Sequence, residues 1–177
     1  MVVGFLLFIN SNTTNWNSHI MKPEQEHAPL NILLADDDLD DRSFFEKALK
    51  EVSISTNLTT VNDGEHLMKY LADNSKQLPN VLFLDLNMPR KNGFECLVEI
   101  IENEKLKDIS IIIFSTSYPQ DKSYELGMIS TLFKLGARVY IRKPTDFNHL
   151  KQLIDHSLRM VVEKVVSNIR LNYILNA

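Results

Sequence analysis

Short apolar runs that end abruptly at polar residues constrain this chain more than any other feature. Three unbroken runs occupy residues 32–35, 81–84 and 111–114, and Asp or Ser follows each of them at once. Continuous apolar runs of this length are typical of strands that are buried on both faces of a parallel sheet. Two weaker strands are predicted at residues 58–61 and 139–141, and the polar neighbours of the second suit an edge of the sheet.

Apolar residues recur three and four positions apart between these runs, as on the buried face of a helix. Asp38, Asp40 and Asp41 suit a helix N-terminus, and Gly136 follows one stripe where many helices end. Strands that alternate with helices predict an α/β fold with a parallel sheet. The five helical segments are expected around residues 45–52, 67–71, 94–101, 126–135 and 150–158.

The overall charge and the cysteine content exclude several classes of protein. The 177 residues include 19 Lys and Arg and 23 Asp and Glu, so the formal net charge is −4. No basic excess favours direct binding to nucleic acid. The single cysteine, Cys96, excludes an internal disulfide framework and fits a reducing, cytoplasmic compartment.

Both ends of the chain are expected to lie outside the domain, which we place at residues 30–158. Residues 2–9 are apolar, but a membrane-spanning helix takes about 18 apolar residues and a secretory signal begins with positive charge. We therefore expect residues 1–29 to be a poorly ordered extension; the alternative is a short amphipathic segment that contacts a membrane surface or a partner. Residues 159–177 carry apolar side chains at helical spacing, which predicts a helical tail that packs on the domain or on a partner.

Polar residues that can bind ligands or take part in reactions follow the ends of the predicted strands. Ligands of open α/β sheets bind beyond the carboxyl ends of the strands, so side chains at these positions are expected to share one rim. Only the fold brings them together, because they are far apart in the sequence. These residues are Asp36, Asp37, Asp85, Ser115 and Lys143.

Three carboxylates on one rim indicate a cation site. Like charges raise one another's pKa unless a cation neutralises them, and Mg²⁺ prefers carboxylates and other oxygen ligands. Ser115 and Lys143 can hold phosphoryl oxygens by hydrogen bonding and charge, and a carboxylate can attack phosphorus to form an acyl phosphate. The residues therefore predict Mg²⁺-assisted phosphorylation of an aspartate.

Four motifs at the predicted strand ends resemble those of the response-regulator receiver domains of two-component signalling. The resemblance covers about residues 30–158. It implies a flavodoxin-like, doubly wound sheet of five parallel strands in the order 2-1-3-4-5 with helices on both faces, as in stand-alone regulators of the chemotaxis type. The motifs are ILLADDD at residues 32–38, FLDLNMP at 83–89 with Gly93 beyond it, FSTS at 114–117 and YIRKP at 140–144.

The resemblance also implies roles for the matching residues of the rim. Asp85 would be the phosphoacceptor. Asp36, Asp37 and Asp85 would hold Mg²⁺ together with the backbone carbonyl of Asn87. Lys143 would contact the phosphoryl group, and the family's lysine is followed by a cis peptide bond to proline.

Ser115 and Tyr140 would form the switch that follows phosphorylation. The family's hydroxyl residue moves toward the phosphoryl group, and its aromatic residue then turns inward. One departure from the family concerns this region, because 28 positions separate Ser115 from Lys143, several more than is usual. The extra length falls between residues 117 and 136, so the signalling face is less well defined than the phosphorylation site.

The functional expectation is a stand-alone cytoplasmic response regulator. It would accept phosphate on Asp85 from a histidine kinase or a histidine phosphotransfer protein, and would then act by contact with a downstream protein or a second copy of itself. Its only catalysis would be its own phosphotransfer and autodephosphorylation, and it would neither bind nucleic acid directly nor span a membrane. The alternatives are a phosphorylation-independent interaction module and an aspartyl-phosphate phosphatase of the haloacid dehalogenase type; Asn87 stands where such a phosphatase needs a second Asp.

Overall fold

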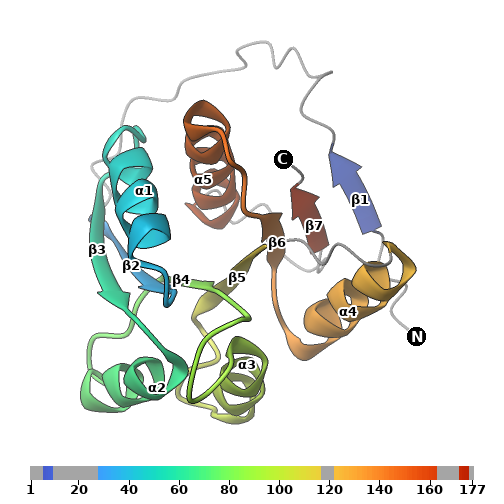
Figure 1. Ribbon diagram of the computed structural model, residues 1–177. Helices are drawn as coiled ribbons and strands as arrows, with labels where there is room; N and C mark the ends of the chain where they lie inside the picture. The colour runs from blue at the N-terminus through green and yellow to red at the C-terminus, as the bar shows by residue number, and fades with distance from the viewer. Residues whose placement is uncertain (1–5, 10–27, 117–121, 163–171, 176–177) are drawn as a thin grey trace.

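A parallel β-sheet lies between two layers of helices in the computed structural model (Figure 1). The structure describes residues 6–9, 28–116, 122–162 and 172–175. The strands are β1 (Leu6–Ile9), β2 (Leu30–Ala35), β3 (Thr56–Val61), β4 (Val81–Leu84), β5 (Ser110–Ser115), β6 (Val139–Arg142) and β7 (Asn172–Leu175). The helices are α1 (Leu39–Lys50), α2 (Gly64–Asp73), α3 (Gly93–Glu102), α4 (Lys122–Leu135) and α5 (Phe147–Val162).

The strand order confirms the predicted topology. The sheet runs β1-β7-β6-β5-β4-β2-β3 and all of its pairs are parallel. Its five strands from β2 to β6 therefore have the expected 2-1-3-4-5 order, with the first and third of them side by side. The carboxyl ends of β2, β4, β5 and β6 are consequently neighbours along one edge of the sheet.

Two strands from the ends of the chain extend this sheet beyond the prediction. β7 pairs with β6, with Val139 opposite Tyr173, and β1 pairs with the outer side of β7. The expectation that β6 is an edge strand is therefore wrong. The structure has β1 at residues 6–9, where a poorly ordered extension is expected, and β7 at residues 172–175, where a helical tail is expected. Both strands are only four residues long and pair across most of the chain, so no local pattern marks them. The rest of the expected extension and tail, at residues 1–5, 10–27, 163–171 and 176–177, lies outside the described residues.

Polar residues set the ends of the helices. The side chain of Asp38 accepts hydrogen bonds from the backbone N–H groups of Asp40 and Asp41 and so caps α1. This cap satisfies donors that have no partner within the helix, and it places negative charge at the positive end of the helix dipole. α4 ends before Gly136, whose φ of 115° lies in the left-handed region that favours glycine, as predicted.

Separate hydrophobic clusters fill the two faces of the sheet. α1 and α5 cover one face, and α2, α3 and α4 cover the other (Figure 1). Phe45 of α1 packs edge to face on Phe83 of β4 and Phe114 of β5, with ring centroids 4.8 and 5.6 Å apart. Burying a ring of this kind stabilises the fold by about 1.5–3 kcal/mol. Because both faces are covered, β4 and β5 are buried along their whole length, which explains the apolar runs at residues 81–84 and 111–114.

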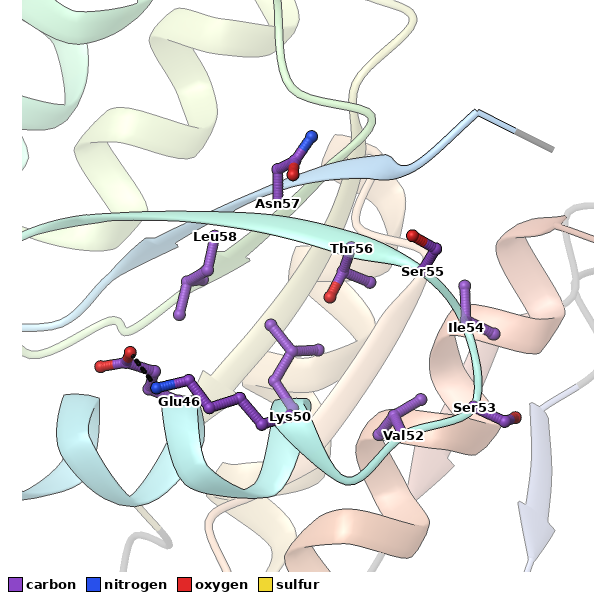
Figure 2. A pocket seen from close by; sticks show the side chains of 10 residues that line it. Glu46, Lys50, Val52, Ser53, Ile54, Ser55, Thr56, Asn57 and Leu58 are labelled. Carbon is purple, nitrogen blue, oxygen red and sulfur yellow. Dashed lines mark hydrogen bonds and ion pairs between the residues drawn. The ribbon is translucent and has the colours of Figure 1, made fainter. Parts of the chain in front are cut away.

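A hollow of about 580 Å³ lies between the end of α1 and the start of β3 (Figure 2). Val52, Ile54 and Leu58 are among its lining residues, and an ion pair of 2.7 Å joins Lys50 to Glu46 beside it. This hollow is at the amino end of the strands, so it is at the opposite end of the sheet from the predicted rim. None of the predicted site residues lines it.

Candidate functional site

The structure brings the predicted rim residues together beyond the carboxyl ends of four neighbouring strands. Asp36 and Asp37 directly follow β2, Asp85 follows β4, and Ser115 is the last residue of β5. Lys143 directly follows β6. Asp36, Asp85 and Ser115 are buried, whereas Asp37 is exposed. The rim is thus a partly enclosed acidic pocket that opens to solvent beside Asp37.

Three carboxylates of this pocket are close enough to share one cation. One oxygen each from Asp36, Asp37 and Asp85 lies within 4.8 Å of the others. Burial, opposed by Lys143 and assisted by the charge of Asp85, raises the pKa of Asp36 to about 6. Among the described atoms, Oδ2 of Asp36 accepts no hydrogen bond of ordinary angular geometry, although Nζ of Lys143 lies 2.9 Å from it. A buried carboxylate oxygen of this kind suits a hard divalent cation such as Mg²⁺.

Lys143 supplies the positive charge of the pocket. Its Nζ lies 3.0 Å from Oδ2 of Asp85 and 2.8 Å from Oδ2 of Asp41, and its side chain is 8% exposed. Burial alone would lower the pKa of this ammonium group, but the negative charges of Asp85 and Asp36 raise it above its ordinary value. From the sequence, Asp41 is expected only at the start of a helix. Its contact with Lys143 joins residues 102 positions apart, and no local signal indicates it.

Both carboxylate oxygens of Asp85 have partners. Ser115 donates its hydroxyl to Oδ1 at 3.0 Å, and the backbone N–H of Asn87 donates to the same oxygen at 3.2 Å. Lys143 donates to Oδ2 at 3.0 Å. Gly93, at the start of α3, allows the close approach behind Asp85, because a Cβ atom there would lie 2.0 Å from the Asp85 carbonyl oxygen. The side chain of Asp85 is therefore oriented by groups from three different parts of the chain.

Tyr140 lies away from the rim, fully buried between the sheet and α4. Its hydroxyl donates to Oε1 of Glu125 at 3.4 Å. Glu125 is buried in α4 and accepts two further hydrogen bonds, of 2.8 and 2.7 Å, from the guanidinium group of Arg142. Glu125 and Arg142 are not predicted from the sequence; an acidic residue within the apolar stripe of α4 is the available signal for Glu125.

Two further expectations concern the Lys143–Pro144 peptide bond and the lengthened segment at residues 117–136. The described residues include no cis peptide bond, so the expected cis bond between Lys143 and Pro144 is wrong. The lengthened segment contains α4, which has 14 residues, while residues 117–121 lie outside the described part of the chain.

Comparison with known proteins extends these observations. Residues 32–155 match the response regulator receiver domain. Response regulator Rcp1 of Synechocystis sp. is 36% identical over 119 residues, which cover 63% of this chain and 80% of the relative. Two-component response regulator ARR17 of Arabidopsis thaliana is 28% identical over 138 residues, which cover 73% of this chain and 85% of the relative.

Solved structures of cyanobacterial response regulators superimpose on most of the chain. The phosphorylated cyanobacterial phytochrome response regulator RcpA has a TM-score of 0.65 at 28% identity, and the alignment covers 78% of this chain and 98% of RcpA. The Mn²⁺-bound form of Rcp1 has a TM-score of 0.64 at 26% identity, with coverages of 78% and 98%. In the part of the chain that the structure describes, no helix is long and apolar enough to cross a membrane.

Proposed function

The chain belongs to the response regulator receiver family, and from this membership we propose that Asp85 is its phosphoacceptor. The donor would be the phosphohistidine of a histidine kinase or of a histidine phosphotransfer protein. The set of contacts on Asp85 carries this proposal, because Ser115 and the Asn87 backbone bind one carboxylate oxygen and Lys143 binds the other. Homologous response regulators are signalling proteins rather than enzymes, so the expected product is a modified protein, an aspartyl phosphate, that carries a signal.

The proposed transfer exchanges one bond to phosphorus for another. A carboxylate oxygen of Asp85 bonds to phosphorus while the bond from phosphorus to the histidine nitrogen breaks. The electron pair of the broken bond stays on the leaving nitrogen, which takes up a proton. Lys143 stays close to the reacting carboxylate throughout, and its positive charge offsets the charge of the incoming phosphoryl oxygens.

Receiver domains bind Mg²⁺ or Mn²⁺ at an acidic pocket, and the pocket of this chain has the donors for such an ion. We assign Asp36, Asp37, Asp85 and the backbone carbonyl of Asn87 as its ligands. When bound, the cation neutralises charge that accumulates where carboxylates and phosphoryl oxygens meet. The raised pKa of Asp36 supports this assignment, as does its buried Oδ2 atom, whose described partner is the Lys143 ammonium group.

The proposed output is a change of shape on the face formed by α4, β6 and α5. After transfer, the Ser115 hydroxyl would donate to a phosphoryl oxygen in place of the Asp85 carboxylate. The backbone N–H of Lys143 donates to the Ser115 carbonyl at 2.9 Å, so a shift of Ser115 is passed directly to β6. Tyr140, two residues before Arg142 in β6, would repack with α4 and expose a different surface to a downstream protein or to a second copy of the chain.

The proposed setting is the cytoplasm, where histidine kinases present their phosphohistidine. Cys96 is a buried free thiol, and burial raises its pKa to about 11, which keeps it unreactive. The phosphatase alternative gains no support from the family to which the chain belongs. The phosphorylation-independent module would require an inactive pocket, whereas the carboxylates and Lys143 are all present in this one.

Phosphorylation by a small-molecule donor tests the proposal directly. The chain is incubated with acetyl phosphate in the presence and absence of Mg²⁺, and the intact mass is measured. We expect the addition of one phosphoryl group that requires Mg²⁺ and that is lost in Asp85→Asn. Asp73→Asn is the matched control, because it removes an exposed carboxylate whose ion pair with Lys69 lies on the surface of α2. Equal labelling of Asp85→Asn and the unaltered chain would refute the assignment.

A further inference from the structure

A second buried carboxylate lies outside the pocket, at the start of α2. Asp63 is fully buried and caps this helix by accepting a hydrogen bond of 2.8 Å from the backbone N–H of His66. It also accepts hydrogen bonds from the His66 ring and from the guanidinium group of Arg90. Burial would raise the pKa of Asp63, but these hydrogen bonds outweigh it and hold the pKa well below the ordinary range. Asp63 is therefore a charged acceptor for Arg90.

Arg90 is held in a backbone conformation that its side chain disfavours. Among the described residues it alone of the non-glycines has a positive φ, at 64°. The left-handed region is costly for a residue with a Cβ atom, so contacts with the surrounding structure must maintain it. Of the two carboxylates near its guanidinium group, Asp63 is in direct contact and Glu65 lies farther away, at 3.9 Å. This ion pair acts together with a 2.8 Å hydrogen bond from the Lys91 N–H to the Pro89 carbonyl, which spans Arg90.

Arg90 is at the tip of the loop that connects Asp85 to α3, at residues 86–92. The base of this loop is closed by a 3.0 Å hydrogen bond from the Gly93 N–H to the Leu86 carbonyl. Its tip rests on α2, because a Cβ atom on Gly64 would lie 2.2 Å from the carbonyl oxygen of Lys91. The start of α2 is therefore a support against which the whole loop is placed.

The same loop carries Asn87, whose backbone N–H donates to the Asp85 carboxylate and whose carbonyl we assign to the cation. We propose that Asp63 and Arg90 are positioning residues for the phosphorylation site, because their ion pair holds the loop in the conformation that presents the Asn87 backbone. The relevance of the Asp63–Arg90 ion pair to phosphoryl transfer rests on the function proposed above, whereas its effect on the loop conformation does not.

Substitutions at both partners test this role. Asp63→Asn keeps a residue that caps helices as well as Asp does, but removes the charge that Arg90 contacts. Arg90→Ala removes the guanidinium group from a side chain that is 48% exposed, so the fold is retained. Arg90→Lys preserves the charge, and Asp73→Asn again removes an exposed carboxylate, from the same helix α2.

Two measurements are made on each folded variant, namely the Mg²⁺ dissociation constant and the amide exchange of residues 86–92 without metal. We expect Asp63→Asn and Arg90→Ala to bind Mg²⁺ roughly three- to tenfold more weakly, as is typical for perturbed couplings of this kind. Exchange within the loop should accelerate in both, with Arg90→Lys intermediate and Asp73→Asn unchanged. The double variant should lose no more than the worse single variant, because both residues act through one contact.

The results that would contradict the positioning role differ from those that would refute Asp85 as the phosphoacceptor. A lower melting temperature with unchanged Mg²⁺ affinity and loop exchange would show that the pair is only structural and overturn the proposal, as would losses that add in the double variant. Failure of the phosphoacceptor proposal would instead appear as the absence of Asp85-dependent labelling in the unaltered chain. The exchange measurement does not depend on that labelling.

Discussion

The acidic pocket and the contact between α4 and β6 both pair buried carboxylate groups with a positively charged side chain. The two regions differ in the ratio of negative to positive groups. In the pocket, one ammonium group faces three carboxylates, because Lys143 contacts Asp36, Asp41 and Asp85. In the α4–β6 contact, the single carboxylate of Glu125 faces the single guanidinium group of Arg142.

This difference separates a binding site from a structural contact. A buried excess of like charge raises the free energy of the folded chain, and a further cation removes that cost. A balanced pair of one carboxylate and one guanidinium group has no such demand and instead fixes the relative position of two elements. The comparison predicts that Mg²⁺ should change the effect of substitutions in the pocket but not of those at Glu125.

Removal of the pocket's ammonium group should have the largest effect. Lys143→Ala leaves three carboxylates without their shared cation, and breaking a buried pair in this way typically costs about 3–5 kcal/mol. We expect urea denaturation in EDTA to show a loss of this order, and Mg²⁺ to restore part of it. The variant should still bind Mg²⁺ but should fail to transmit phosphorylation to a partner. A loss of folding free energy below about 0.5 kcal/mol is typical of an ordinary surface lysine and would contradict this prediction.

Neutralising Asp36 should stabilise the metal-free chain. The pKa of Asp36 is raised to about 6 in the folded state, so folding is favoured by protonation below the ordinary pKa of 3.8. This contribution is lost as the pH rises from 3.8 through 6. Asp36→Asn should therefore be more stable than the unaltered chain by about 3 kcal/mol at pH 7 in EDTA.

Urea denaturation of both chains across this pH range measures the difference. The advantage of Asp36→Asn should shrink toward pH 4, and Mg²⁺ should stabilise only the unaltered chain. An Asp36→Asn variant that is less stable at pH 7 in EDTA would contradict the excess of negative charge in the pocket.

Breaking the balanced pair should cost less and should not respond to Mg²⁺. Glu125→Ala leaves the Arg142 guanidinium group, whose side chain is 35% exposed, without its carboxylate partner, so we expect a loss of about 1–3 kcal/mol. Chemical denaturation with and without Mg²⁺ should give the same loss. A Mg²⁺-dependent loss would show that the two regions are not electrostatically independent.

The hydroxyl of Tyr140 should contribute least to stability. Its hydrogen bond to Glu125 is 3.4 Å long, so Tyr140→Phe should lower the free energy of unfolding by no more than about 1.5 kcal/mol. The sharper readout is amide exchange in α4 upon addition of beryllofluoride and Mg²⁺, which mimic the phosphoryl group. We expect the change in α4 to be smaller in Tyr140→Phe, and an unchanged response would remove Tyr140 from the switch.

The amino-acid sequence alone predicted the alternation of strands and helices from β2 to α5 and most residues of the pocket. Unbroken apolar runs identify β2, β4 and β5, because only buried strands of a parallel sheet have both faces covered. Asp36, Asp85, Ser115 and Lys143 could be predicted because each follows or ends a strand, and the carboxyl ends of neighbouring parallel strands meet at one edge.

Only the tertiary structure decided which further residues act on that pocket and where the sheet ends. Asp41 contacts Lys143, Arg90 contacts Asp63 and Glu125 contacts Arg142 across 102, 27 and 17 positions, and each of these side chains also suits an ordinary solvent-exposed position. β1 and β7 pair with each other although almost the whole chain separates them in the sequence. Periodicity and capping describe interactions within one turn or one strand, whereas these contacts depend on the packing of several elements, which no local pattern encodes.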